Sequence, residues 1–248
     1  MNGRREVRSR QTLASAVVLA LAIAAAGWWI GGGLVAIRTG DRSVTVKGLS
    51  EQDVRADLAI WPLRFVATGN DLAVAQAKLS GDAGTVRAFL IEAGLEPGEI
   101  ELRSLEVTDL LAQAYRSGPV DSRFIVAQTL VARSTDVDRV ASASQRVGAL
   151  VDAGVVLGGQ NSGAQGPYYL FTRINDVKAA MIADATQKAR ETAQQFADDA
   201  DSSIAGIRRA QQGVFQILPR DTAPGFQEET QIEKTLRVVT TIDYALDD

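Results

Sequence analysis

The 248-residue chain contains neither cysteine nor histidine. Without cysteine it can form no disulfide and no thiolate nucleophile, and without histidine it lacks the commonest general base. Zinc and copper also lose their preferred sulfur and nitrogen ligands. Carboxylates remain, but pairs such as Asp53 and Asp57 have the spacing of ordinary surface residues. We therefore assign no catalytic residue, no metal ligand and no cofactor, and we expect a protein that is not an enzyme.

Clusters of positive charge are also missing, apart from the start of the chain. Residues 1–38 hold five arginines and one glutamate, so the remainder is more acidic than the overall balance of 26 basic and 30 acidic residues suggests. Proteins bind nucleic acids through clustered lysine and arginine side chains. No such stripe occurs after residue 38, and nucleic acid is therefore not an expected partner.

One long segment, between Arg10 and Arg38, contains no charged residue at all. A helix of about 20 apolar residues crosses a bilayer, and preceding basic residues keep the amino terminus in the cytoplasm. The pattern predicts a single-pass protein of the inner membrane. Its expected parts are a basic cytoplasmic segment (1–10), a transmembrane anchor (11–37), a linker (38–42) and a periplasmic domain (43–248).

A cleaved signal peptide is the second interpretation of this segment. The basic start and the run Ala24-Ala25-Ala26 fit a signal peptide, and cleavage near Ala26 would release a soluble periplasmic protein. Against cleavage, the apolar run continues for about ten residues beyond Ala26, which favours the anchor. Both interpretations leave the body on the same side of the membrane.

Two residue pairs mark the far part of the apolar segment. Trp28 and Trp29 fit membrane-interface positions, where amphipathic rings gather. Gly27 and Gly31 form a GxxxG pair that suits packing between membrane helices, although the glycines from Gly31 onward equally suit a loosened helix end.

The body alternates between strand and helix patterns. Apolar and polar residues alternate in the strands, whereas apolar residues recur every three to four positions in the helices. Strands are expected at 43–48, 54–68, 99–111, 122–133, 155–159, 167–173, 204–218 and 232–246, and helices at 70–93, 136–152 and 175–201. In the second strand the apolar residues change from even-numbered to odd-numbered positions at Trp61-Pro62. This change of parity predicts a bulge there or two strands with a kink.

The predicted fold class is α+β, a largely antiparallel sheet covered by helices. The order strand–helix–strand–strand occurs twice, in residues 54–133 and 155–246, with one helix between these halves. The longest helix carries a stripe of mostly small residues: Val177, Met181, Ala185, Ala189, Thr192, Phe196 and Ala200. A coiled-coil seam would need larger residues, so we expect this helix to lie close against its own sheet.

Five segments, taken in order, resemble the SIMPL-domain family of bacterial periplasmic and membrane-anchored proteins. They are residues 43–65, 92–102, 124–140, 152–159 and 202–213, with the long helix leading into the last. The resemblance implies a self-contained α+β domain that tends to self-associate outside the cytoplasm. It implies no enzymatic activity and no catalytic residue, although some members are linked to envelope or oxidative stress.

Two segments of the body are candidates for recognition. The glycine-rich loop 158–166 could hold an anion through backbone amides, although a flexible turn between strands is much the commoner explanation of such glycines. The aromatic residues Tyr168, Tyr169 and Phe171 could form an interaction patch or a strand with one face in the core.

Three functions follow from these observations. The first is a non-enzymatic, membrane-tethered envelope protein, held in the inner membrane through residues 11–37, that self-associates as a scaffold or serves a stress response. Its expected partner is a further copy of itself, and the sequence names no other protein partner. The second is a module that binds a small molecule or cell-wall fragment through loop 158–166 and Tyr168/Tyr169. The third is an enzyme of a type whose residues we do not recognise.

Overall fold

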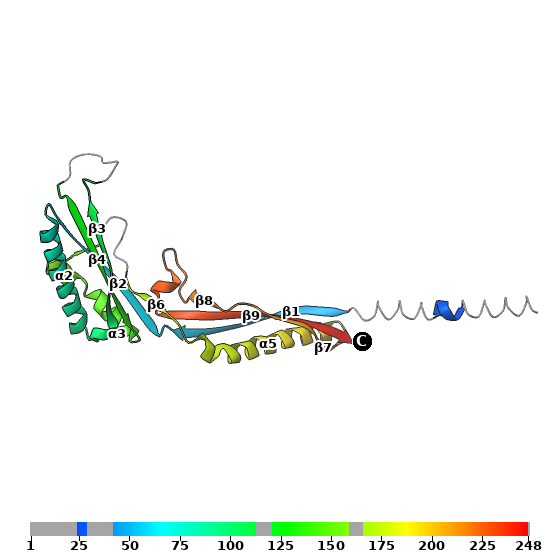
Figure 1. The fold of residues 1–248 in the computed structure, drawn as a ribbon. Coiled ribbons are helices and arrows are strands. Elements are labelled where there is room, and N and C mark those ends of the chain that lie inside the picture. Colours follow the sequence, from blue (N-terminus) through cyan, green and yellow to red (C-terminus); the bar gives the residue numbers. More distant parts are fainter. Residues whose placement is uncertain (1–23, 29–41, 113–120, 159–165, 248) are drawn as a thin grey trace, which may run out of the picture. The chain divides into compact units, whose positions relative to one another are not determined.

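The computed structural model describes residues 24–28, 42–112, 121–158 and 166–247. These residues adopt an α+β fold with two antiparallel sheets and helices laid on them, as predicted (Figure 1). The chain divides into two compact units. Unit 1 comprises Met1–Gly48, Ala185–Gly213 and Thr240–Asp248, and unit 2 comprises Leu49–Asp184 and Val214–Val239.

The elements follow one another in the expected order of strands and helices. The strands are β1 (Ser43–Arg55), β2 (Leu58–Gly69), β3 (Ile100–Asp109), β4 (Phe124–Ser134), β5 (Val156–Leu157), β6 (Tyr168–Leu170), β7 (Ser203–Gln212), β8 (Gln216–Pro219) and β9 (Glu233–Asp247). The helices are α2 (Leu72–Glu92), α3 (Val137–Gln145), α4 (Gly148–Asp152) and α5 (Ile174–Asp199), with 3-10 turns η1 (Pro97–Glu99) and η2 (Glu228–Thr230).

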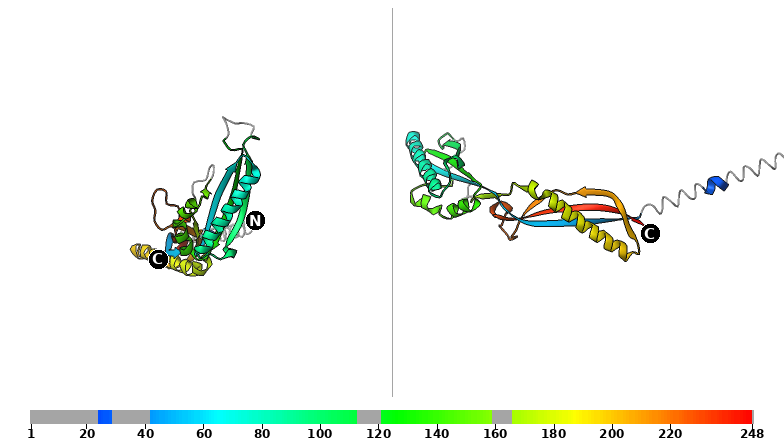
Figure 2. Two further views of the ribbon diagram at one scale, coloured as in Figure 1. Left: turned by 90° about the vertical axis from the view of Figure 1, so that its left-hand side faces the viewer. Right: turned by 90° about the horizontal axis from the view of Figure 1, so that it is seen from below.

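In unit 1, the part of strand β9 from Thr240 onward lies between the Ser43–Gly48 part of β1 and strand β7, and in unit 2 the earlier part of β9 pairs with β8. Strand β9 runs antiparallel to β7, from Ser203↔Asp247 to Gln212↔Thr240, with two irregularities in the register. It also runs antiparallel to β1, because Arg42 accepts from the backbone of Leu246 and Thr45 donates to Asp243. Helix α5 lies along one face of this sheet in two different views (Figures 1 and 2).

The α5 contact in unit 1 is made by alanines. Ala185, Ala189, Ala193 and Ala197 are fully buried at steps of four residues. Ala189 and Ala193 pack against Val46, Ile242 and Tyr244 of the sheet. A methyl group added at Gly48 would lie 1.8 Å from the Ala185 carbonyl oxygen, so helix and strand approach backbone to backbone. The expectation that this helix lies close on its own sheet is therefore confirmed.

The predicted residues of the stripe are right only as far as Ala189. Beyond it the buried positions are Ala193 and Ala197, whereas Phe196 is 57 % exposed. The prediction shifted the stripe to include the large apolar Phe196. The close approach of the helix to the sheet selects alanine instead, because a phenylalanine ring has no room between the two backbones.

In unit 2, a sheet with the order β3–β4–β2 is covered on one face by α2. Leu79, Val86 and Leu90 of the helix pack against Phe65 and its neighbours in a core of large side chains. The rings of Trp61 and Phe89 meet edge to face, with centroids 6.4 Å apart. Short strands β5 and β6 pair with the other edge of β2.

The predicted bulge at Trp61-Pro62 is wrong. Strands β2 and β4 pair without interruption from Ala59↔Ser134 to Gly69↔Phe124. The parity of the buried residues changes earlier, between Leu58 and Ala59, just after Ala56 and Asp57 separate β1 from β2. The alternative prediction of two strands is therefore right, with the break earlier than expected. Pro62 causes no break in this pairing. On the edge of β2 away from β4, strand β6 pairs only up to Ile60 and strand β5 only from Phe65. The amide hydrogen that proline lacks therefore falls where no described strand needs it.

Two helix boundaries also differ from the prediction. The helix expected from residue 70 begins at Leu72, and Asp71 caps it by accepting hydrogen bonds from the amides of Ala73 and Val74 at 2.7 and 3.3 Å. The helix expected at 136–152 is divided into α3 and α4, which are separated by Arg146 and Val147. The spacing of apolar residues along the sequence does not show such a break, since α3 and α4 both keep their apolar residues on one side.

Candidate functional site

The predicted aromatic patch forms most of strand β6 and its continuation. Tyr168, Tyr169 and Leu170 pair with Ile60, Ala59 and Leu58 of β2. Tyr169 is only 6 % exposed, Phe171 is also buried, and Tyr168 is half-buried. Little of Tyr169 or Phe171 is therefore left for contact with a second protein.

Tyr169 instead lines a surface hollow of about 380 Å³ in unit 2. The hollow lies between helix α3 and the segment that precedes β9. Its lining residues are Ala141, Ser144, Gln145, Tyr169, Asp221, Thr230, Gln231, Ile232 and Glu233. Tyr169 is the predicted site residue that the structure brings into it, and the other lining residues were not predicted.

The wall formed by residues 220–233 is held by specific hydrogen bonds. The Gln231 side-chain amide donates to the Asp221 carbonyl oxygen at 2.8 Å and accepts from the Asp221 amide at 3.1 Å. The carbonyl oxygen of Ile232 accepts from the amide of Ala56 at 2.8 Å. Both ends of this wall are thus fixed to neighbouring backbone.

Lys234 anchors the same wall from inside. Its side chain is fully buried, and its ammonium group donates to the carboxylate and the carbonyl oxygen of Glu228 in η2. A buried charge needs such a partner because burial removes its water. The sequence did contain a signal for it: Lys234 continues the even-numbered positions of β9 that face the core.

The charged residues that line the hollow, Asp221 and Glu233, are acidic, and basic side chains lie near Glu233. Arg55 forms an ion pair with Asp138 and lies 3.9 Å from Glu233, which is also 4.0 Å from Arg220. Burial raises the pKa of the Tyr169 hydroxyl above its ordinary value, the hydrogen bond with Ser144 opposes this rise, and the charge of Asp138 adds to it. The Tyr169 hydroxyl therefore stays protonated at neutral pH and can serve as a hydrogen-bonding group, not as a base.

Asp53 and Asp57 have separate structural partners. Asp53 accepts from the Thr235 hydroxyl at 2.8 Å. Asp57 accepts from the amide and hydroxyl of Thr172 and from Arg173 at 2.9, 3.0 and 3.1 Å. These contacts fix the start of α5 to the β1–β2 junction, and they leave neither carboxylate directed at the other.

The glycine-rich loop is described only at its two ends. The amide of Gly158 donates to the Arg64 carbonyl oxygen at 2.8 Å, and the Arg64 side chain donates to the Gly158 carbonyl oxygen at 3.2 Å. The Gly158 amide is therefore not available to an anion. Residues 159–165, and with them the rest of this predicted site, lie outside the described residues.

The membrane predictions fall mostly outside the described ranges. Gly27 and Trp28 belong to a helical segment at residues 24–28, in which Trp28 is 84 % exposed. Trp29, Gly31 and the remainder of the expected anchor lie outside the described residues. In the part of the chain that the structure describes, no helix has the length and apolar character needed to cross a membrane.

Acidic side chains do not gather into a metal site among the described residues: no group of three or more could hold an ion. This includes Asp198, Asp199 and Asp201 at the end of α5. The described residues thus offer a polar hollow in unit 2 and strand edges with which no described strand pairs.

The comparisons with known proteins agree with the resemblance read from the sequence. The family model of SIMPL, described as "Protein of unknown function (DUF541)", matches residues 44–244. A comparison with curated proteins found no match. The match covers the strands and helices of both units but assigns no activity to any residue.

Proposed function

We propose, from the premise that the chain belongs to the SIMPL family, that it is a membrane-tethered, non-enzymatic envelope protein that self-associates as a scaffold. In this proposal residues 11–37 hold the chain in the inner membrane, the amino terminus is cytoplasmic, and the body lies in the periplasm. The body, residues 43–248, is the part of the chain that assembles.

The open edges of the sheets are the observation that carries this proposal. Strand β3 ends the sheet of unit 2 and leaves Leu102, Leu105 and Val107 more than half exposed. Strand β7 ends the sheet of unit 1 and is exposed along nearly its whole length. Unpaired strand edges with exposed apolar side chains bind further strands readily, which favours assembly of like chains.

The assembly state of the full chain tests this proposal. The protein is purified in detergent and in lipid nanodiscs, and its mass is measured by light scattering after size exclusion. Oligomers that persist on dilution to about micromolar concentration, a range typical of specific association, support a scaffold. A monomer in both environments contradicts it.

The membrane tether is tested separately in cells. Fractionation followed by protease treatment of spheroplasts should find the body at the outer side of the inner membrane. Sequencing the amino terminus of the mature protein distinguishes the two proposals for residues 11–37. An intact start supports the anchor, whereas a new start near residue 27 supports a released periplasmic protein.

A second candidate function is binding of a small molecule or cell-wall fragment, and the hollow beside Tyr169 is the observation that favours it. A soluble disaccharide–tetrapeptide of peptidoglycan serves as the probe. Binding, measured as a shift in melting temperature, should weaken in Tyr169→Phe, which loses the hydroxyl beside Ser144. Tyr168→Phe is the matched control, since Tyr168 does not line the hollow. Equal shifts in both variants and in the unaltered protein would exclude this site.

A further inference from the structure

The sheet of unit 1 has two long outer strands that run in the same direction. Strand β9 lies between β1 and β7 and is antiparallel to both. Among the described strands, each of the two pairs on one side only. A sheet whose two outer strands are parallel can be extended indefinitely by copies of itself in one orientation. One outer strand of each copy then pairs with the opposite outer strand of the next copy.

Strand β7 is the more accessible of these edges. Its residues from Ser203 to Gln212 are exposed except for the half-buried Ile204, and Ile207 is 50 % exposed. On β1, alternate side chains such as Thr45 and Lys47 are exposed on the face opposite α5. The outer edge of each strand therefore has backbone amide and carbonyl groups available for pairing, and α5 covers only one face of these strands.

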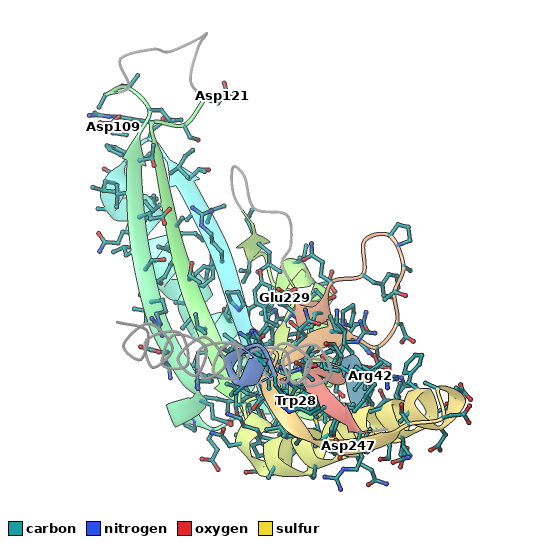
Figure 3. All side chains as sticks on the ribbon, turned by 90° about the vertical axis from the view of Figure 1, so that its right-hand side faces the viewer. Trp28, Arg42, Asp109, Asp121, Glu229 and Asp247 are labelled. Atoms are coloured by element: carbon teal, nitrogen blue, oxygen red, sulfur yellow. The ribbon has the colours of Figure 1, made fainter. Side chains whose placement is uncertain are left out.

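Both outer strands begin at the same end of the sheet. Ser203, the first residue of β7, pairs with Asp247 at the end of β9, and the adjacent Leu246 donates to the Arg42 carbonyl oxygen just before β1. Arg42 and Asp247 accordingly lie near each other in Figure 3. The chain therefore enters β1 at this end of the sheet, and the proposed anchor precedes β1 in the sequence.

We propose that β1 of one copy pairs in parallel with β7 of the next copy, so that the sheets of unit 1 join into one continuous sheet. The proposal rests on the proposed membrane tether. Two β7 strands, or two β1 strands, would pair antiparallel about a twofold axis and would place the two anchors at opposite ends of the joined sheet. Parallel pairing of β1 with β7 keeps every anchor on the same side, as one membrane requires.

Charge also disfavours pairing of β7 with itself. The strand carries Arg208 and Arg209 and no carboxylate, so two copies side by side would bring like charges together. The part of β1 that belongs to unit 1, Ser43–Gly48, carries a single charged side chain, Lys47, so β7 meets fewer cations there than on a second β7. The sheet of unit 2 cannot propagate in the same way, because opposite its long edge β3 it has only the two-residue β5 and the three-residue β6.

Cysteine cross-linking tests this pairing directly, because the chain has no cysteine of its own. Lys47→Cys and Gln211→Cys introduce one thiol on each outer strand. Gln211 of β7 pairs with Thr241 of β9. On the other side of β9, Thr45 of β1 lies beside Asp243, so Lys47, two residues further along β1, lies beside Thr241 as well. The two thiols are therefore at the same level of the sheet. The full-length variants are expressed in membranes and treated with a short bis-maleimide, which tolerates a small shift in register.

The expected result is a cross-linked dimer when the two variants are co-expressed, and a ladder of larger species when one chain carries both thiols. Each variant alone should give no cross-linked dimer. A dimer from Gln211→Cys alone would overturn the proposal in favour of β7 pairing with itself, and a dimer from Lys47→Cys alone would do so in favour of β1.

Charged substitutions on the strand edges distinguish the pairing of β1 with β7 from the more general proposal that the protein is a self-associating scaffold. Ile207→Lys adds a third cation to β7 and should weaken assembly at least about tenfold, as should the exposed Gln211→Lys. Leu105→Lys on β3 is the matched control and should leave assembly intact. Circular dichroism establishes that each variant remains folded.

Two other results have distinct meanings. If the unaltered chain assembles and only Leu105→Lys dissociates it, the interface is β3, so this proposal fails and the scaffold stands. If the unaltered chain gives no oligomer in any membrane or detergent, both fail.

Discussion

Helices α5 and α2 each cover a sheet, but they do so with side chains of opposite size. In unit 1 the contact consists of alanines against Val46, Ile242 and Tyr244, and Gly48 lets the strand touch the helix backbone. In unit 2 leucines, valines and aromatic rings fill a thicker core around Trp61 and Phe65. The α5 contact depends on the close approach of helix and strand backbones, whereas the α2 contact depends on the volume of the buried side chains.

This difference means that the two contacts should fail in opposite ways. Large apolar side chains contribute stability in proportion to the area they bury, so the unit 2 core is weakened when a side chain is shortened. A contact between small residues buries less area per side chain and gains from dense packing of backbone atoms, so it is weakened when a side chain is enlarged. Substitutions in both directions can therefore test the comparison.

The largest effect is expected at Gly48. In Gly48→Ala the new methyl group would meet the Ala185 carbonyl oxygen at 1.8 Å, and the atom it meets is backbone that cannot rotate away. We expect a loss of about 4 kcal/mol or more of unfolding free energy. Thermal unfolding, with hydrogen exchange to locate the change in unit 1, measures it. Gly206→Ala on β7 is the control, because its methyl group meets nothing within 4 Å. Equal melting temperatures for the two variants would contradict the close contact.

Truncation should be most damaging in unit 2. Phe65 is fully buried, and Phe65→Ala should cost about 3–5 kcal/mol because it removes a ring and leaves a cavity. Chemical denaturation measures the loss. Phe196→Ala on α5 removes an equally large but mostly exposed ring and should change stability by less than about 0.5 kcal/mol. Comparable losses in both variants would mean that Phe196 is covered, for example by another copy.

Enlargement should be selectively harmful in unit 1. Ala189→Leu forces a larger side chain between α5 and the sheet, which should cost about 1–3 kcal/mol. Leu79→Met in α2 keeps its volume and should cost less than about 1.5 kcal/mol. Melting curves of the two variants provide the comparison, and an unchanged curve for Ala189→Leu would show that this face of α5 is not packed on the sheet.

The smallest effect is expected at the end of α5. Asp201 has a positive φ of 49° and follows a helix whose last turn is acidic. Asp201→Gly relieves the backbone and removes a negative charge from the negative end of the helix dipole, so it should stabilise the protein by about 0.5–1 kcal/mol. Asp199→Asn removes a nearby charge without changing the positive-φ position. If it raises the melting temperature as much as Asp201→Gly, charge and not φ accounts for the gain.

Much of this architecture could be predicted from local sequence patterns. The alternation of residues 232–246 predicted strand β9, and the three-to-four-residue spacing at 70–93 predicted helix α2, because such features depend on neighbouring residues alone. The strands expected at 99–111 and 122–133 correspond to β3 and β4, which are adjacent in sequence and pair with each other.

The candidate site was much less predictable. Tyr169 was chosen for its aromatic neighbours, but Ser144 and Gln231, which line the same hollow, come from distant segments with no motif in common. Lys234 was missed although its position on β9 indicated burial, because the identity of its partner Glu228 depends on how the loop between β8 and β9 folds back. Single-sequence patterns do not contain such contacts.

The sequence by itself determined the α+β class and the preference of α5 for small residues, because these follow from short-range periodicity and composition, and its ordered segments carried the resemblance to the family. The tertiary structure decided which alanines of α5 are buried, where the parity of β1 and β2 changes, and which strands form the sheet edges. Each of these depends on how closely two backbones distant in sequence approach each other. Gly48 against Ala185 is the clearest case, since nothing near either residue predicts the other.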